Sequence, residues 1–152
     1  MINNNELEKN ISLDKFTTFK TGGLARFFAK IDNIENLLEC LQAAQKSKMP
    51  VFILGAGSNI LINDEGYDGL VLKVANKKLE INDNQNGTFD IVVGAGWGLN
   101  NLINVLTEKS ISSVEKLFGI PGTIGGSIRG NAGANDFEIK DVIKKVYNID
   151  WL

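Results

Sequence analysis

The sequence predicts a folded chain of mixed helices and strands, arranged in two small lobes. Hydrophobic residues make up 43% of the 152 residues and charged residues 22%, as in globular rather than disordered proteins. Short apolar runs alternate with stretches of helical periodicity. The chain has 16 glycines and only 2 prolines. The glycines cluster beside the apolar runs, where a backbone must turn or approach a ligand closely.

The first lobe follows a polar lead-in at residues 1–12, which we expect to be loose. Residues 25–31 are predicted to form a strand. Asp32 and Glu35 have the spacing of a capping box and indicate the start of a helix. Apolar residues at helical spacing extend that helix: Ile34, Leu37, Leu38, Leu41 and Ala44. Cys40 lies beside this stripe, so we interpret it as a packing residue rather than a nucleophile.

The rest of the first lobe alternates apolar runs with a loop. Residues 51–54 are predicted to form a short buried strand, and the glycine-rich segment 55–59 follows as a loop. A further apolar stretch covers 60–62, and residues 69–74 are predicted to form another strand. We expect the boundary between the lobes near residues 75–88.

The second lobe starts with a polar turn at residues 82–87 and a strand at 90–93. A second amphipathic helix is predicted from Leu99, Leu102, Ile103 and Leu106. The segment 119–134 (GIPGTIGGSIRGNAGA) is too rich in glycine for a regular helix or a central strand. Residues 142–151 are predicted to form a final strand. Because nothing follows to cover that strand, we expect the chain to be the first part of a longer protein.

Composition excludes several classes of function. The net charge of -2 and two isolated lysine doublets, at 77–78 and 144–145, argue against nucleic acid as a partner. A single cysteine excludes an internal disulfide. The absence of histidine removes the commonest metal ligand and any histidine-linked flavin, so no metal site is predicted. The N-terminus has no apolar run for a signal peptide or membrane span. We therefore expect a cytoplasmic protein without a membrane partner.

Two glycine-rich loops have different interpretations. In the loop at 55–59, successive backbone N–H groups after a strand can converge on phosphate oxygens, and Ser58 and Asn59 add side-chain donors. A tight turn with a packing role is the alternative there. The loop at 93–98 is interpreted as structural, because Trp97 would crowd a pyrophosphate and its glycines suit a bulge or a helix entry.

The third glycine-rich segment, 119–134, favours a ligand. It has 6 glycines in 16 residues, which makes backbone approach to a large ligand the natural explanation. Its embedded Ile120, Ile124 and Ile128 favour an ordered, half-buried path over a flexible loop.

Four motifs occur in an order that resembles a known family. They are TTFKTGG at 17–23, LGAGSNIL at 54–61, GIPGTIGG at 119–126 and NAGA at 131–134. One of them alone is a weak signal, but four in this order are specific. From about Leu13 to its end, the chain resembles the N-terminal part of the UDP-N-acetylenolpyruvoylglucosamine reductase family, also called UDP-N-acetylmuramate dehydrogenase.

The resemblance implies an α+β fold, a two-lobed FAD-binding domain of the vanillyl-alcohol-oxidase/PCMH type without the C-terminal substrate domain. Lobe 1 would span 13–80 and lobe 2 would span 81–152, with non-covalent FAD between them. The family is an NADPH-dependent oxidoreductase of peptidoglycan synthesis that acts on a nucleotide sugar. NADPH gives a hydride to FAD, which passes it to the enolpyruvyl double bond to yield UDP-N-acetylmuramate.

The same resemblance implies the binding residues. Residues 55–61 would wrap the FAD pyrophosphate, and residues 121–127 and 131–134 would line the flavin and its ribityl-phosphate arm. The expected cofactor-binding residues are Gly55, Ala56, Gly57, Ser58, Asn59, Ile60, Leu61, Pro121, Gly122, Thr123, Gly125, Gly126, Ser127, Asn131, Gly133 and Ala134. No catalytic residue is expected in this chain, because the family's serine, arginine and glutamate lie in or next to the later substrate domain.

Some residues depart from the family pattern. Asn135 and Asp136 stand where an aromatic residue and a glycine are common, and a carboxylate at Asp136 near a flavin would be mildly unfavourable. We expect Arg129 to pair with a phosphate or a core group. Glu115 and Glu138 are expected to be surface or helix-start charges. Two alternatives stay open: a short FAD-binding module without reductase activity, and another flavin oxidoreductase with the same domain.

Overall fold

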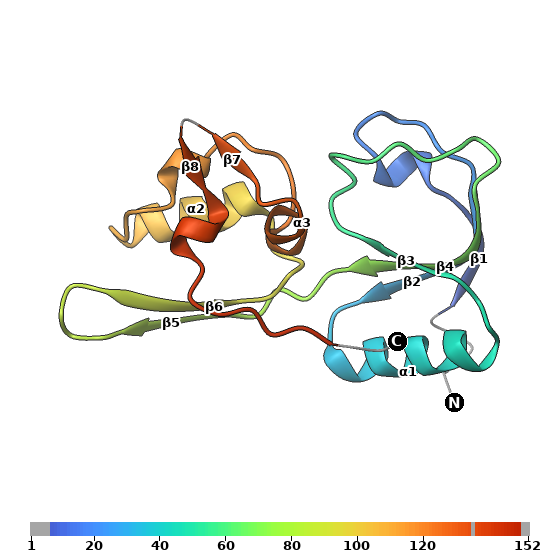
Figure 1. Cartoon of the computed structure of the whole chain (residues 1–152), viewed down its shortest axis with the longest axis horizontal. Coiled ribbons are helices and arrows are strands. Elements are labelled where there is room, and N and C mark those ends of the chain that lie inside the picture. The colour runs from blue at the N-terminus through green and yellow to red at the C-terminus, as the bar shows by residue number, and fades with distance from the viewer. Residues whose placement is uncertain (1–6, 135, 150–152) are drawn as a thin grey trace. The chain divides into compact units, whose positions relative to one another are not determined.

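A computed structural model of the chain describes residues 7–134 and 136–149 (Figure 1). The chain divides into two compact units, residues 1–76 and 77–152. Each unit has its own hydrophobic cluster. The division falls after Asn76, within the region 75–88 where we expected the boundary and four residues before the expected end of lobe 1 at residue 80. Asn135 and residues 150–152, which belong to segments interpreted above, lie outside the described residues.

The first unit is built on a four-stranded sheet. Its strands, in spatial order, are β1 (Glu8–Ser12), β2 (Leu24–Ile31), β4 (Tyr67–Val74) and β3 (Val51–Leu54). Strand β1 is antiparallel to β2, whereas β2, β4 and β3 run parallel. The carboxyl ends of the three parallel strands therefore lie at one edge of the sheet, which is where ligands bind in many α/β folds.

The lead-in that we expected to be loose contains strand β1, which is a correction. Its residues pair with β2 in register, with Ile11 opposite Ala25. The side chains of Glu8, Lys9 and Asn10 are exposed, so the segment lacks the apolar alternation by which a sequence reveals a strand. Backbone hydrogen bonds to the edge of β2 make it a strand, and these come only with the tertiary fold.

Helix α1 (Ile34–Lys46) is confirmed, but it begins differently from the prediction. Asn33, not Asp32, is its N-cap: the Asn33 side chain accepts a hydrogen bond from the Asn36 N–H at 2.8 Å. The helix lies along one face of the sheet (Figure 1) and buries Cys40 together with Leu41 and Ala44. The packing role predicted for Cys40 is confirmed.

The other face of the sheet is covered by loops. Phe28 on β2 lies opposite Val71 on β4, and both are buried in a cluster with Leu13, Ala25 and Leu54. Phe16, Ile60 and Ile62, from the segments before β2 and after β3, pack against this cluster. The loop that follows β3 is therefore held over the sheet by its own apolar side chains.

The second unit packs a β-hairpin and two helices around one core. Strands β5 (Leu79–Asp83) and β6 (Phe89–Val93) flank the predicted polar turn. Helix α2 (Leu99–Glu108) buries its predicted apolar face. The buried cluster comprises Leu99, Leu102, Ile103, Leu106, Leu117, Ile124 and Ile139. Short 3-10 helices cover Asp14–Phe16 in the first unit, and Glu115–Leu117 and Ile139–Val142 in the second.

The glycine-rich segment 119–134 contains a helix, contrary to the sequence prediction. Helix α3 (Ile124–Arg129) begins at Thr123, whose side chain accepts a hydrogen bond from the Gly126 N–H at 3.3 Å. Glycine disfavours helices in isolation, but this cap and tertiary packing override that propensity. The segment ends in the two-residue strand β7 (Gly133–Ala134), which pairs with β8 (Phe137–Glu138).

The predicted strand at 142–151 is also wrong over its described residues. Val142 ends a 3-10 helix, and residues 143–149 form no regular element. Ile143 packs against the core, and the Lys144 ammonium binds the Asp90 carboxylate. Val146 and Tyr147 are exposed, because no strand among the described residues pairs with this segment.

Candidate functional site

The glycine loop of the first unit starts where strand β3 ends. Its chain passes close over the 3-10 helix at Asp14–Phe16, and the Thr18 N–H donates to the Gly57 carbonyl at 2.9 Å. Gly57 is buried and has a φ of +70°. A Cβ at that position would lie 1.9 Å from the Phe16 carbonyl oxygen. The fold itself therefore requires glycine at position 57, whatever the loop binds.

Other residues of this loop face solvent. Ala56, Asn59 and Leu61 are exposed, and Leu61 is 78% accessible. Gly55 and Ser58 are half-buried. The loop thus presents backbone and small side chains at the carboxyl-end edge of the parallel strands, an arrangement that can accept a large polar ligand.

A lysine that the sequence reasoning missed lies beneath this loop. Lys73 on β4 is half-buried, and its ammonium donates a hydrogen bond to the Gly55 carbonyl. It is in register with Lys30 on β2, so the two lysines point to the same face of the sheet. Burial, and then the charge of Lys30, lower the pKa of Lys73 below its ordinary value of 10.5.

The strand pattern carried a signal for Lys73. In residues 70–74 (LVLKV), Lys73 has the parity of Val71, which is fully buried. A lysine at an inward position of a central strand is unusual, because burying an unpaired charge is costly. Lys73 interrupts an otherwise apolar run, and this interruption could have singled it out from the sequence.

The second candidate segment, in the other unit, is built around helix α3. Thr123 and Ser127 are buried, while Pro121 and Gly126 are exposed. Gly122 has a φ of 144°, which favours glycine. A Cβ on Gly125 would lie 2.9 Å from the Ala95 Cβ, so this glycine allows close packing.

Gly126 differs from its neighbour. A Cβ there would meet only the Thr123 Oγ1, at 3.4 Å, which is an ordinary contact. Its backbone is helical, and the residue is exposed. Because glycine costs about 1 kcal/mol relative to alanine within a helix, the fold alone gives no reason for glycine at this position.

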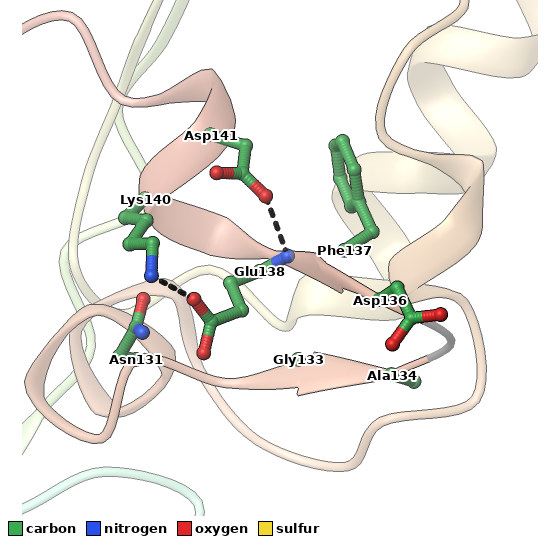
Figure 2. A pocket seen from close by; sticks show the side chains of 8 residues that line it. All are labelled: Asn131, Gly133, Ala134, Asp136, Phe137, Glu138, Lys140 and Asp141. Carbon is green, nitrogen blue, oxygen red and sulfur yellow. Dashed lines mark hydrogen bonds and ion pairs between the residues drawn. The ribbon is translucent and has the colours of Figure 1, made fainter.

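A pocket lies beside strands β7 and β8 (Figure 2). It collects three predicted site residues, Asn131, Gly133 and Ala134, with residues from the segment that follows. Its complete lining is Asn131, Gly133, Ala134, Asp136, Phe137, Glu138, Lys140 and Asp141. The residues from Phe137 onward were missed by the motif reasoning because they lie outside the motif, although their chain pairs directly with it.

Hydrogen bonds and ion pairs order the pocket. The Asp141 carboxylate accepts from the Glu138 N–H at 2.9 Å, and Lys140 forms an ion pair with the Glu138 carboxylate (Figure 2). Bonds from Lys140 and then from Asn131 lower the pKa of Glu138. With Asp136, the lining carries three carboxylates and one ammonium. This excess negative charge disfavours a phosphate in the pocket.

Two of the charged residues for which we predicted no catalytic role, Glu115 and Glu138, lie at the starts of 3-10 helices. Glu115 is the first residue of its 3-10 helix and accepts from the Ser113 N–H at 2.6 Å. Glu138 is the N-cap of the following one. We expected both to be surface or helix-start charges, and the structure places both at helix starts. Arg129 ends helix α3 and is exposed.

The loop at 93–98 connects elements of the second unit, as its structural interpretation expected. The Ile124 N–H donates to the Trp97 carbonyl at 2.8 Å, and the Gly125 N–H donates to the Ala95 carbonyl at 2.9 Å. Gly98 is the N-cap of α2. The Trp97 Nε1 is buried without a hydrogen-bond partner among the described residues.

The two units offer different chemistry to a ligand. The first unit offers a glycine loop beside two ammonium groups, which suits phosphates. The second unit offers an exposed helical glycine and an acidic pocket, which disfavours phosphates.

Comparison with known proteins identifies the family of this chain. The chain belongs to the FAD-binding domain family, whose family model matches residues 25–150. More particularly, it is similar to UDP-N-acetylenolpyruvoylglucosamine reductases and matches their N-terminal half. It is 39% identical over 150 residues to that of Orientia tsutsugamushi strain Boryong, covering 98% of this chain and 49% of the relative. It is 40% identical over 146 residues to that of Prochlorococcus marinus strain NATL2A, covering 95% and 49%.

A solved structure gives the same result. The crystal structure of UDP-N-acetylenolpyruvylglucosamine reductase from Thermus caldophilus matches with a TM-score of 0.68 and 30% identity, over 89% of this chain and 46% of that chain. The predicted α+β FAD-binding fold and the family resemblance are thereby confirmed. The chain spans about half the length of the curated relatives it matches. In the described part of the chain, no helix is long and apolar enough to cross a membrane.

Proposed function

We propose that this chain binds FAD non-covalently as the flavin domain of an NADPH-dependent reductase. The reductase would convert UDP-N-acetylglucosamine enolpyruvate to UDP-N-acetylmuramate in peptidoglycan synthesis. The family and the names of the relatives support this proposal. Bound FAD would supply the hydride-accepting and hydride-donating chemistry. The residues of this chain would bind and orient it, and the substrate-protonating groups would lie outside the chain.

Each unit has a distinct part in the proposal. Residues 55–61 would bind the pyrophosphate through backbone N–H groups at the carboxyl-end edge of the sheet. Residues 121–127 and 131–134 would approach the flavin and its ribityl arm. The acidic lining beside β7 and β8 supports this division, because three carboxylates there disfavour the phosphates.

The main structural support for the proposal is the glycine at position 126. Gly57 and Gly125 are explained by contacts within the protein, whereas Gly126 has room for a side chain and retains none. An exposed helical glycine that the fold does not need is expected where a ligand lies against the backbone.

The test is flavin binding by the purified chain. We expect the visible flavin spectrum to stay with the protein after gel filtration with added FAD. Gly126→Ala should weaken FAD affinity by about tenfold, since a methyl group would occupy ligand space. Gly87→Ala is the control: Gly87 belongs to the β5–β6 turn and to neither candidate segment, so its substitution should leave FAD affinity unchanged.

The outcomes separate the candidate functions. A chain that ignores FAD contradicts the proposal. Equal affinity for wild type and Gly126→Ala removes segment 121–127 from the flavin site. If a protein extended to the length of the relatives binds FAD but does not oxidise NADPH with the enolpyruvyl substrate, the chain is a binding module or serves another flavin oxidoreductase.

A further inference from the structure

We infer that Lys73 and Lys30 form a cationic pair that fixes the glycine loop and neutralises the phosphates of the ligand it holds. Lys73 is the positioning residue of this pair, and Lys30 adds charge. The inference rests on the proposed function and extends it to two residues outside the family motifs quoted above.

The two lysines are brought together by strand register. Lys30 on β2 lies opposite Lys73 on β4, and Lys73 lies opposite Leu54 on β3. Leu54 is the residue immediately before Gly55, where the loop begins. Both lysines are the penultimate residues of their strands, so their ammonium groups lie at the carboxyl-end edge where the loop starts.

Their charge is not balanced within the protein. In the part of the chain that the structure describes, neither ammonium forms an ion pair with a carboxylate. Like charges opposite one another on neighbouring strands destabilise a sheet, and half-burial of Lys73 adds a desolvation cost. An anion at the loop would remove both penalties, because it would supply the missing counter-charge.

A role in protecting the sheet edge does not explain the pair. Lysines often occupy edge strands, where they discourage pairing with other chains. Here β2 lies between β1 and β4, and β4 lies between β2 and β3. Both lysines are therefore on interior strands, where such protection is not needed.

The hydrogen bond from Lys73 explains how the loop is held. Its ammonium donates to the carbonyl of Gly55, the first residue of the loop. Engaging this carbonyl turns its negative end toward the sheet and away from the ligand. The field of the two ammonium groups then favours an anion beside the backbone N–H groups of the loop.

The experiment compares ligands that differ in phosphate. FAD, riboflavin and inorganic pyrophosphate are titrated into the ¹⁵N-labelled chain, with flavin fluorescence for affinity and amide shifts of residues 55–59 for location. The variants are Lys73→Met, Lys73→Arg and Lys30→Met. Lys46→Met on α1 is the matched control, because Lys46 is an exposed lysine on another element.

We expect Lys73→Met to weaken FAD binding by about tenfold or more, which corresponds to losing one charge-assisted hydrogen bond. Lys73→Arg, which keeps the charge, should recover most of that loss. Lys30→Met should weaken FAD by a smaller factor, and riboflavin affinity should not change. Far-UV circular dichroism checks that each variant folds. If Lys73→Met does not fold, the FAD affinities of Lys73→Arg and Lys30→Met test the inference.

Other results would overturn the inference in distinguishable ways. If FAD binds and neither lysine variant changes its affinity, the inference fails and the proposed function stands. Equal losses for riboflavin and FAD would also overturn it, since they indicate a general structural role. If FAD does not bind but pyrophosphate shifts the 55–59 amides in a Lys73-dependent way, the anion site stands and the proposed function fails. Binding of neither ligand overturns both.

Discussion

Gly57 and Phe16 lie so close that the α-carbon of Gly57 has no room for a side chain: a Cβ would be 1.9 Å from the Phe16 carbonyl oxygen. The Gly57 carbonyl also accepts the Thr18 N–H at 2.9 Å. These contacts hold the glycine-rich loop at residues 55–59 against the segment before β2. It also means that substitution of Gly57 tests folding before it tests ligand binding.

Gly57→Ala should therefore lower stability more than an ordinary glycine substitution in a turn. Gly87→Ala is the comparison, since Gly87 has a φ of +82° but open space around it, against +70° and a clash at Gly57. We expect a loss of about 1–2 kcal/mol for Gly87→Ala from backbone strain alone. Gly57→Ala should lose about 1–3 kcal/mol more, because the packed backbone must shift. Urea denaturation measures both, and equal losses would show that the contact yields without cost.

The adjacent glycines of helix α3 should respond in opposite directions without FAD. Gly125→Ala places a Cβ 2.9 Å from the Ala95 Cβ and should destabilise the second unit by about 1–3 kcal/mol. Gly126→Ala meets no close neighbour and should stabilise it by up to about 1 kcal/mol through helix propensity. Thermal unfolding of the FAD-free variants decides this, and a destabilised Gly126→Ala would show that the fold requires this glycine.

The Asp90 carboxyl should titrate below its ordinary value of 3.8, because the Lys144 ammonium donates to both of its oxygens, at 3.0 and 2.8 Å. We expect Lys144→Met to raise the Asp90 pKa toward 3.8. Lys145→Met should not, because Lys145 lies over the Tyr147 ring. Side-chain ¹³C NMR titration gives the midpoints directly, and an unchanged Asp90 midpoint in Lys144→Met would contradict the ion pair.

The same pair sets a direction for stability. A carboxyl whose pKa is lower in the folded state contributes stability above the unfolded value of 3.8 and loses it as pH falls through the folded pKa. The stability difference between wild type and Lys144→Met should therefore shrink as the solution is acidified below about pH 4. No such change is expected for the difference between wild type and Lys145→Met.

Lys73 should make stability depend on pH in the alkaline range instead. Its pKa is lowered from 10.5, by burial first and by Lys30 second, so the folded state releases its proton before the unfolded state does. In that window the unfolded chain binds more protons, and stability rises with pH. The stability of wild type relative to Lys73→Met should therefore increase as pH rises through the lowered folded pKa toward 10.5. Denaturation of wild type and Lys73→Met at several alkaline pH values tests this, and a difference that does not change with pH would contradict it.

Local patterns in the sequence were sufficient for much of the fold. Helix α2 was predicted from the apolar spacing of Leu99, Leu102, Ile103 and Leu106, because helical periodicity is visible within a short stretch of sequence. The polar turn before β6 and the buried position of Cys40 were predicted for similar reasons. The four glycine motifs predicted the family, since glycines recur where a backbone must turn or approach a ligand.

Only the tertiary structure decided the rest. Strand β1 exists because β2 offers an edge, and helix α3 forms because Thr123 caps it and Gly125 packs against Ala95. In the sequence, Gly57 and Gly126 are both glycines within motifs and cannot be told apart. In the structure, contact with Phe16 leaves no room for a side chain at Gly57, whereas Gly126 has room for one. In the same way, Lys30 and Lys73 are 43 positions apart in the sequence, and the register of two parallel strands makes them neighbours. Local periodicity determines elements such as α2, whereas contacts between distant segments determine β1 and α3 and decide which side chains share a site.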